Sequence, residues 1–329
     1  MEKQEQTYIG VDISKAKFDI YFKSATGQET KAKLDNNAAG FAELLSHLPS
    51  EPWVVMEASG PYYYQLACFL YDQGITVSVV NPLVIKRFSQ MQLSRTKTDS
   101  ADAKSIAEYG SLLQMNPWKP LKACYLEIKQ WYAYRKQLLK HRHAVQMKLE
   151  AFVSTGELNS LLRESIDDEL FRLDENIKGV DRHLDRLIEQ ENSQLREQLE
   201  SVPGIGPKTS LLLIVALRGF EDFQNYKQVI SYLGLSPRIY ESGTSVKGKA
   251  KICKMGMSEV RKCLYMAARS ARAYNKACTE LYTRLRAKGK AHRVAMVAVV
   301  NKLIKQAFTI VRSDGYYVQD HYTTRVVTK

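Results

Sequence analysis

The most informative stretch of this 329-residue chain is Tyr8-Ile-Gly-Val-Asp-Ile13. Its apolar and β-branched residues predict a buried strand. A carboxylate inside such a strand is costly unless something pairs with it. The run over residues 18–22 alternates and can pair with the first strand through a short turn, and residues 30–34 offer a more polar edge strand. The chain therefore begins with three strands, the first of which carries one unusual acid, Asp12.

Helices and strands alternate after this point. The predicted elements are a helix over 37–48, a strand over 53–56, a helix over 62–73, a strand over 75–80 and helices over about 83–92 and 100–114. Pro61 opens the second of these helices and Gly74 stops it. The order β-β-β-α-β-α-β-α predicts an α/β domain with at least five strands and with helices on the sheet faces.

Four acids stand at telling places in this order. Asp12 lies in the first strand, Glu57 ends the fourth strand, and Asp99 and Asp102 begin the last helix, where their i, i+3 spacing puts them on one face. A ribonuclease-H-type fold would bring all four together. Converging carboxylates favour hard divalent cations, and two such ions can clamp the oxygens of a phosphodiester. Taken singly, Asp99 and Asp102 are also explained as ordinary helix-start charges, so the prediction rests on the whole set.

The middle of the chain, residues 126–200, has little Gly or Pro and strong helical periodicity. Its apolar residues recur at heptad-like steps, at Leu170, Leu173, Ile177, Val180, Leu184 and Leu187. A second possible seam runs through Trp131, Tyr134, Leu138, Val145, Leu149 and Phe152. Two interpretations fit this spacing: an antiparallel hairpin within one chain, and a coiled coil that joins two chains.

The positive charge is concentrated at the C-terminal end. The chain carries 48 Lys and Arg against 35 Asp and Glu, a net charge of +13. Residues 1–125 hold 13 basic and 13 acidic residues, residues 126–200 hold 12 and 15, and residues 201–329 hold 23 and 7. A domain this basic favours a polyanionic partner, and nucleic acid is the usual one. The basic residues are spread through the domain rather than set on one amphipathic helix, which argues against a membrane surface.

This basic segment opens with Val202-Pro-Gly-Ile-Gly-Pro-Lys-Thr209, followed by an apolar helix over 210–217. The pattern resembles the second half of a helix-hairpin-helix, in which Gly204 and Gly206 would let a phosphate approach backbone N–H groups beside Lys208. An ordinary helix turn is the plainer interpretation. Beyond it follow a segment over 229–235, a loop over 236–256 and helices over about 258–287 and 292–311, so we expect a mostly helical domain.

The expected loop is rich in Gly, Lys and hydroxyl groups. Lys247, Lys249 and Lys251 would attract a phosphate and could lower the pKa of a hydroxyl group. Ser242 is one of several hydroxyls here, so the residues alone do not single it out. Gly243–Lys249 matches the core of a P-loop, but the next residue is Ala250 where a P-loop needs Ser or Thr.

Other site classes and compartments are disfavoured. The six histidines are scattered, and the five cysteines form no CxxC pair, which is typical of a reduced cytoplasmic protein. The N-terminus has no apolar signal core, and the longest apolar runs, 211–217 and 294–300, are too short to span a bilayer. We expect no membrane partner.

The ordered motifs resemble the DEDD insertion-sequence transposases, the IS-one-ten family, which also includes the Piv-type DNA invertases. They are Tyr8–Asp12, Met56–Gly60, Asn81-Pro82, Lys97–Ala103, Pro203–Gly206 and Tyr240–Gly243, and the resemblance extends to about Val311. It implies an RNase H-like (RuvC-like) catalytic domain over 1–125, a helical coiled-coil segment over 126–200 and a mostly α-helical transposase domain over 201–329.

The resemblance also implies the chemistry. Carried over by position, Asp12, Glu57, Asp99 and Asp102 would be the metal-binding tetrad for Mg²⁺ or Mn²⁺, and Ser242 the nucleophile that forms a phosphoserine link with DNA. The implied partners are donor and target DNA and a structured guide (bridge) RNA, in the cytoplasm of a prokaryotic cell. Joining two duplexes calls for a homo-oligomer, a dimer or a tetramer.

Two competing functions remain open from the sequence. The first is a RuvC-like metal-dependent nuclease or junction resolvase, in which water attacks and Ser242 is incidental. The second is a non-catalytic nucleic-acid-binding protein whose acids hold only structural ions.

Overall fold

The computed structural model describes residues 6–24, 26–92, 99–238, 241–242, 246–247, 251–253 and 255–319, without the side chains of residues 99, 100, 241, 242, 246 and 247. The chain divides into two compact units, Met1–Leu121 and Lys122–Lys329. The division into three parts, with boundaries near residues 125 and 200, stays a prediction.

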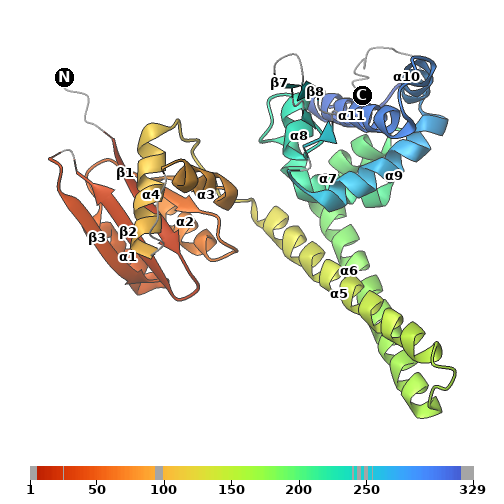
Figure 1. The fold of residues 1–329 in the computed structure, drawn as a ribbon, viewed down its shortest axis with the longest axis horizontal. Helices are drawn as coiled ribbons and strands as arrows, with labels where there is room; N and C mark the ends of the chain where they lie inside the picture. The colour runs from red at the N-terminus through yellow and green to blue at the C-terminus, as the bar shows by residue number, and fades with distance from the viewer. Residues whose placement is uncertain are drawn as a thin grey trace. The chain divides into compact units, whose positions relative to one another are not determined.

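The first unit is a five-stranded sheet with helices on both faces (Figure 1). Its elements are β1 (Thr7–Ile13), β2 (Lys17–Lys23), β3 (Glu29–Asp35), α1 (Ala38–His47), β4 (Pro52–Glu57), α2 (Tyr63–Asp72), β5 (Thr76–Val80), α3 (Pro82–Met91) and α4 (Asp99–Leu112). The strand order is β3-β2-β1-β4-β5; β1, β2 and β3 pair antiparallel, whereas β4 pairs parallel with β1 and β5. The element order predicted from the sequence is confirmed.

The two faces of the sheet bury different residues, because side chains alternate along a strand. Ile9, Val11 and Ile13 of β1 pack in one core with residues of α1 and α2. On the other face Tyr8 packs with Val55 and with residues of α3 and α4. The interior strand β4 is covered on both sides, which explains why residues 53–56 are continuously apolar.

Two glycines fix how α4 lies on the sheet. A Cβ atom at Gly10 would stand 2.0 Å from the Ala103 carbonyl oxygen, so only glycine lets the helix backbone approach β1 this closely. One at Gly110 would stand 3.1 Å from Cδ1 of Tyr8. Helix α4 therefore runs opposite to β1, and its first turn points toward the end of β1 that carries Asp12.

The second unit is mostly helical. Its elements are α5 (Ala123–Val153), α6 (Ser160–Glu200), α7 (Pro207–Leu217), the 3₁₀ turn η1 (Arg218–Phe220), α8 (Tyr226–Tyr232), β6 (Pro237–Arg238), β7 (Glu241–Ser242), β8 (Val246–Lys247), β9 (Lys251–Ile252), α9 (Ser258–Tyr274), α10 (Lys276–Ala287) and α11 (His292–Arg312).

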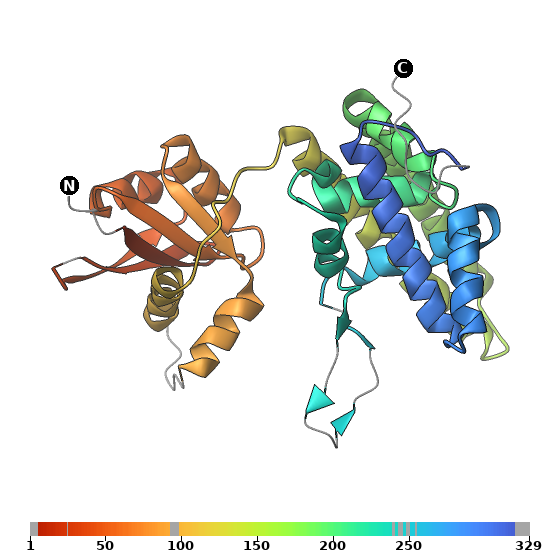
Figure 2. The same cartoon turned by 90° about the horizontal axis from the view of Figure 1, so that it is seen from above.

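Two predictions for this unit need correction. The stretch 258–287 is two helices, because Asn275 leaves the helical conformation and caps α10 through its side chain. The stretch 236–256, expected to be a loop, contains two antiparallel strand pairs, β6 with β9 and β7 with β8, and the β7–β8 pair projects beyond the helices of the unit (Figure 2). Strands of two residues are too short for alternation to be visible in a sequence.

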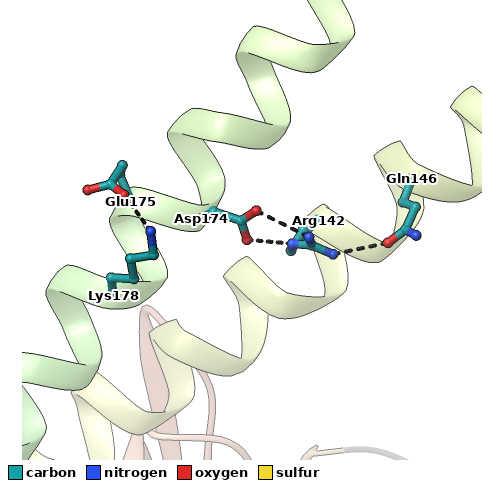
Figure 3. Close-up of polar contacts among 5 residues, drawn as sticks. All are labelled: Arg142, Gln146, Asp174, Glu175 and Lys178. Atoms are coloured by element: carbon teal, nitrogen blue, oxygen red, sulfur yellow. Dashed lines mark hydrogen bonds and ion pairs between the residues drawn. The ribbon is translucent and has the colours of Figure 1, made fainter.

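Helices α5 and α6 form an antiparallel hairpin within the chain. Most of the predicted seam is buried between them, at Leu173, Ile177, Val180 and Leu184. Arg142 binds Asp174 through two hydrogen bonds, Nε to Oδ1 at 2.5 Å and Nη2 to Oδ2 at 3.1 Å (Figure 3). Arg135 binds Asp181 in the same bidentate manner. The structure thus matches the intrachain interpretation, and a coiled coil between chains stays a prediction.

Helix α11 lies in the core of the C-terminal bundle, which consists of α7 to α11. Its apolar residues, Val299, Val300, Leu303 and Ile304 among them, are buried. Within the described residues it is the one helix long and apolar enough to cross a membrane, although 56% of its apolar window is buried inside the unit. It is therefore explained as a core helix.

Candidate functional site

Asp12 and Glu57 lie side by side at the carboxyl ends of two neighbouring parallel strands. The register pairs Gly10 with Val55 and Val11 with Met56, so the next residues along the two strands are Asp12 and Glu57. Gly10 and Val55 face α4, and side chains two positions further along a strand share that face. Both acids are half-buried on the α4 side of the sheet.

The first turn of α4 completes the predicted set of acids. Asp102 is half-buried and directly precedes Ala103, whose carbonyl oxygen lies against Gly10. Asp99 is the first residue of α4, and its side chain lies outside the described part of the structure. Among the side chains that are described, no three His, Cys, Asp or Glu residues lie close enough to hold a metal ion. The four-acid metal site therefore stays a prediction.

The chemistry of the predicted donors fits one kind of ion. All four are carboxylates, which as hard oxygen ligands suit Mg²⁺ or Mn²⁺ rather than a metal that prefers sulfur or imidazole. The parallel strand ends and the start of a helix supply them from three elements. If the four acids converge as predicted, a divalent cation would balance their charge.

A serine two residues after Glu57 orients that carboxylate. Ser59 Oγ donates a hydrogen bond of 2.7 Å to Glu57 Oε1. The turn that allows this contact is fixed by the Ala58 N–H, which bonds to the Val80 carbonyl oxygen at 2.9 Å, and by Gly60 at a φ of 64°. The Ala-Ser-Gly sequence after a buried strand signals a turn, but it does not show where the hydroxyl points.

A further acid, Asp19, lies opposite Asp12 and was not among the site residues predicted from the sequence. The antiparallel register makes Asp12 and Asp19 cross-strand partners, and Asp19 is in turn the partner of Lys33 in β3. Lys33 Nζ lies 3.3 Å from Asp19 Oδ2. The alternation of residues 18–22 indicates on which face of the strand Asp19 lies. The residue opposite Asp19, however, depends on the exact turn between β1 and β2.

The glycine-rich turn before α7 has two different glycines. Gly204 has a φ of 109°, and a Cβ atom there would stand 2.6 Å from Cβ of Ala271, so this glycine is explained by packing on α9. Gly206 is exposed, caps α7 and has no neighbour within 4 Å of a Cβ position. Lys208 is exposed in the first turn of α7. The open end of the helix, at Gly206 and Lys208, suits an anion.

The predicted nucleophile belongs to the short strand pair β7–β8. The backbone of Ser242 pairs with Val246, and that of Glu241 pairs with Lys247. The side chains of Ser242 and Lys247 are not described, and Lys249 lies outside the described residues. Lys251 is exposed in β9. Their predicted roles therefore stay predictions.

The fold and the placed acids define a class of protein. A mixed sheet of order β3-β2-β1-β4-β5, with acids at the ends of β1 and β4 and at the start of the covering helix, is the RNase H-like, RuvC-like domain of enzymes that act on nucleic acids. The predicted fold class is confirmed, with a mostly helical C-terminal part.

Comparison with known proteins names the family. A family model described as Transposase, for the DEDD domain of IS110 elements, matches residues 9–155, and one described as Transposase IS116/IS110/IS902 family matches residues 196–283. The chain is 30% identical over 323 residues to the pilin gene-inverting protein of Moraxella bovis, covering 94% of this chain and 97% of that protein. The chain belongs to the IS110 family of transposases and DNA recombinases.

The chain is also similar to a more distant relative and, over part of its length, to a solved structure. The transposase for insertion sequence element IS1111A of Coxiella burnetii is 22% identical over 324 residues, covering 89% of this chain and 86% of that protein. The RuvC protein of Thermus thermophilus matches with 11% identity and a TM-score of 0.24, in a complex with a Holliday junction substrate, covering 35% of this chain and all of RuvC.

Proposed function

We propose that this IS110-family enzyme cuts and rejoins donor and target DNA through a serine nucleophile, Ser242, assisted by divalent cations at Asp12, Glu57, Asp99 and Asp102. The observation that carries the proposal is the alignment of Asp12 with Glu57 on parallel strands, under the first turn of α4. The similarity to a pilin gene-inverting protein supports a rearrangement of DNA rather than its degradation.

The N-terminal acids would hold the cations, Mg²⁺ or Mn²⁺. When bound, such ions supply Lewis-acid activation of the phosphodiester and offset the charge of its oxygens. Ser59 keeps Glu57 in one orientation through its hydrogen bond. Gly10 keeps the backbone of α4 close to β1, and in the proposed site Asp102 and Asp99 would join Asp12 from the first turn of that helix.

Ser242 would supply the covalent step. Its hydroxyl oxygen forms a bond to phosphorus, the bond from phosphorus to the deoxyribose oxygen breaks, and the hydroxyl proton passes to a neighbouring base or to solvent. The phosphoserine link conserves the phosphodiester bond energy, so a second sugar hydroxyl can reverse the step and join a new strand. Lysines in the same segment, Lys247, Lys249 and Lys251, would attract the phosphate.

The C-terminal domain would bind nucleic acid. Residues 201–329 carry 23 basic and 7 acidic residues, and the exposed start of α7 at Gly206 and Lys208 suits a backbone phosphate. We propose that this surface holds a structured guide RNA as well as DNA. Recombination of two duplexes calls for a dimer or tetramer, in the cytoplasm of a prokaryotic cell.

The serine mechanism is tested with Ser242→Ala, using Ser245→Ala as the matched control in the same segment. We expect Ser242→Ala to abolish covalent protein–DNA adducts and strand joining, and Ser245→Ala to retain both. Persistence of cleavage and joining in Ser242→Ala would replace the proposal with its alternative, a RuvC-like nuclease or junction resolvase in which water attacks.

The guide RNA is tested by sequencing the nucleic acid that co-purifies with the full-length protein. We expect one defined RNA, with loops complementary to two DNA sites. A random sample of cellular RNA would argue against guidance while leaving the serine mechanism untouched.

A further inference from the structure

We propose that Asp19 and Lys33 belong to the carboxylate site, and that the ammonium group of Lys33 offsets the negative charge of this site until a divalent cation binds. The inference rests on the proposed metal site and extends it across the antiparallel half of the sheet. Under it, Lys33 weakens cation binding and Asp19 strengthens it, although neither is one of the four predicted ligands.

The geometry places three charged residues in one row. Asp12 in β1, Asp19 in β2 and Lys33 in β3 are successive cross-strand partners. Partners in an antiparallel pair project from the same face, with Cβ atoms about 4.5–5.5 Å apart. The row therefore lies on the α4 side of the sheet, the side that also carries Glu57.

The burial of Asp19 separates this row from ordinary surface charges. Its side chain is 15% exposed, and Lys33 Nζ lies 3.3 Å from its Oδ2. The adjacent row of the same two strands holds another Lys–Asp pair, Lys17 with Asp35 at 3.8 Å, in which both side chains are more than half exposed. Of these two pairs, only Asp19 with Lys33 includes the cross-strand partner of Asp12.

The charges of Asp19 and Lys33 explain why this pair should change the affinity of the site for a cation. Two carboxylates that face each other across strands destabilise the sheet, and an ammonium group beside them offsets the repulsion. A divalent cation at Asp12 provides the same compensation. Lys33 then becomes a like charge next to that cation, whereas Asp19 remains an attractive one.

The test measures Mn²⁺ binding to the full-length protein without DNA, by calorimetry and by the rise in denaturation temperature with Mn²⁺ concentration. We expect Lys33→Met to tighten binding about fivefold and Asp19→Asn to weaken it about fivefold, the size expected for a partly exposed charge. Lys33→Arg keeps the charge and should bind as the unaltered protein does. Lys31→Met, on the same face of β3 but in the row of Gly10, is the control and should change binding less than twofold.

Opposite shifts would support the inference, because a purely structural ion pair would weaken binding in both variants. Equal shifts, or none, while Asp12→Asn still abolishes binding, would overturn the inference and leave the proposed metal site standing. If Asp12→Asn binds Mn²⁺ as well as the unaltered protein does, the metal site and the inference both fail.

Discussion

Ser59 controls the orientation of one predicted ligand, Glu57, through a single hydrogen bond of 2.7 Å. Removing it in Ser59→Ala leaves the carboxylate free to rotate, and such supporting contacts are typically worth about 10-fold or more in metal affinity or activity. We therefore expect DNA strand cleavage to slow by about 10-fold, with a higher Mg²⁺ requirement. Ser46→Ala, in an exposed serine of the same unit, is the control. Equal rates in both variants would show that Ser59 has no part in the site.

Gly10 determines how closely α4 packs on the strand that carries Asp12. In Gly10→Ala the new methyl group would stand 2.0 Å from the Ala103 carbonyl oxygen, so α4 must move away from the sheet. We expect a loss of unfolding free energy of about 3 kcal/mol or more, measured by urea denaturation. Gly179→Ala in α6 meets nothing within 4 Å and should stabilise the protein by about 0.5–1 kcal/mol. Equal stability of the two variants would contradict the packing described for α4.

Individual residues could be predicted from the sequence only where a local pattern marked them. Asp12 stands out because it interrupts an apolar strand, and Glu57 because it ends one. Asp19 could not be identified, since its importance depends on a register between two strands. The packing of Gly204 against Ala271 could not be predicted either, because the two residues are far apart in the chain.

At the scale of elements, the α5–α6 hairpin depends on charge as well as on its apolar seam. The hydrogen bonds from Arg142 hold the pKa of Asp174 below its ordinary value of 3.8. A carboxyl group with a lowered pKa in the folded state contributes stability at neutral pH that is lost as the pH falls through that lowered value.

The corresponding prediction concerns acid unfolding. The helical signal of the full-length protein should weaken as the pH falls below about 4, and Arg142→Met should lose helix at a higher pH than the unaltered protein does. Circular dichroism between neutral and acid pH measures this. Lys148→Met on the same helix is the control, and identical acid transitions in the two variants would show that the ion pair does not stabilise the hairpin.

Asn275 joins three parts of the C-terminal bundle. Its side chain is fully buried; Oδ1 accepts bonds from the Cys278 N–H at 3.3 Å and the Tyr317 hydroxyl at 3.1 Å, while Nδ2 donates to Gln306 Oε1 at 3.1 Å and to the Pro203 carbonyl oxygen at 3.4 Å. It therefore ties the turn that leads to Gly206 to α10 and α11.

Removing this side chain leaves several buried polar groups without partners. We expect Asn275→Ala to lower the unfolding free energy by about 2–3 kcal/mol, measured by urea denaturation. Asn225→Ala removes a similar cap from α8 at an exposed position, and should cost about 1 kcal/mol. A smaller effect at Asn275 than at Asn225 would contradict the role assigned to the buried contacts.

Helices and strands could be predicted from the sequence where their hydrophobic pattern extends over enough residues. Five strands and four helices of the first unit follow from alternation, glycine and proline. The heptad steps in residues 160–200 predicted a buried seam but left its partner open, because the same spacing serves one chain or two. The strand pairs around Ser242 are too short to leave a pattern, and the break at Asn275 occurs within a continuous helical pattern.

At the scale of the whole molecule, the excess positive charge and the predicted metal-binding acids lie in different regions of the chain. The net charge of residues 1–125 is zero, and the charge of residues 201–329 is strongly positive. Charge alone indicates a polyanionic partner, while the order of the acids along the sheet indicates what is done to it. The sequence indicated the family through the order of several weak motifs over nearly the full length, and the matches over residues 9–155 and 196–283 confirm the family.

The central claim is that Ser242 becomes covalently linked to DNA, and mapping the linked peptide tests it most directly. The full-length protein is incubated with its DNA and divalent cation, denatured, treated with nuclease and protease, and examined by mass spectrometry. We predict a phosphate-linked nucleotide on the peptide that contains Ser242, and its loss in Asp12→Asn. An adduct on another residue, or strand joining with no adduct at all, would contradict the account.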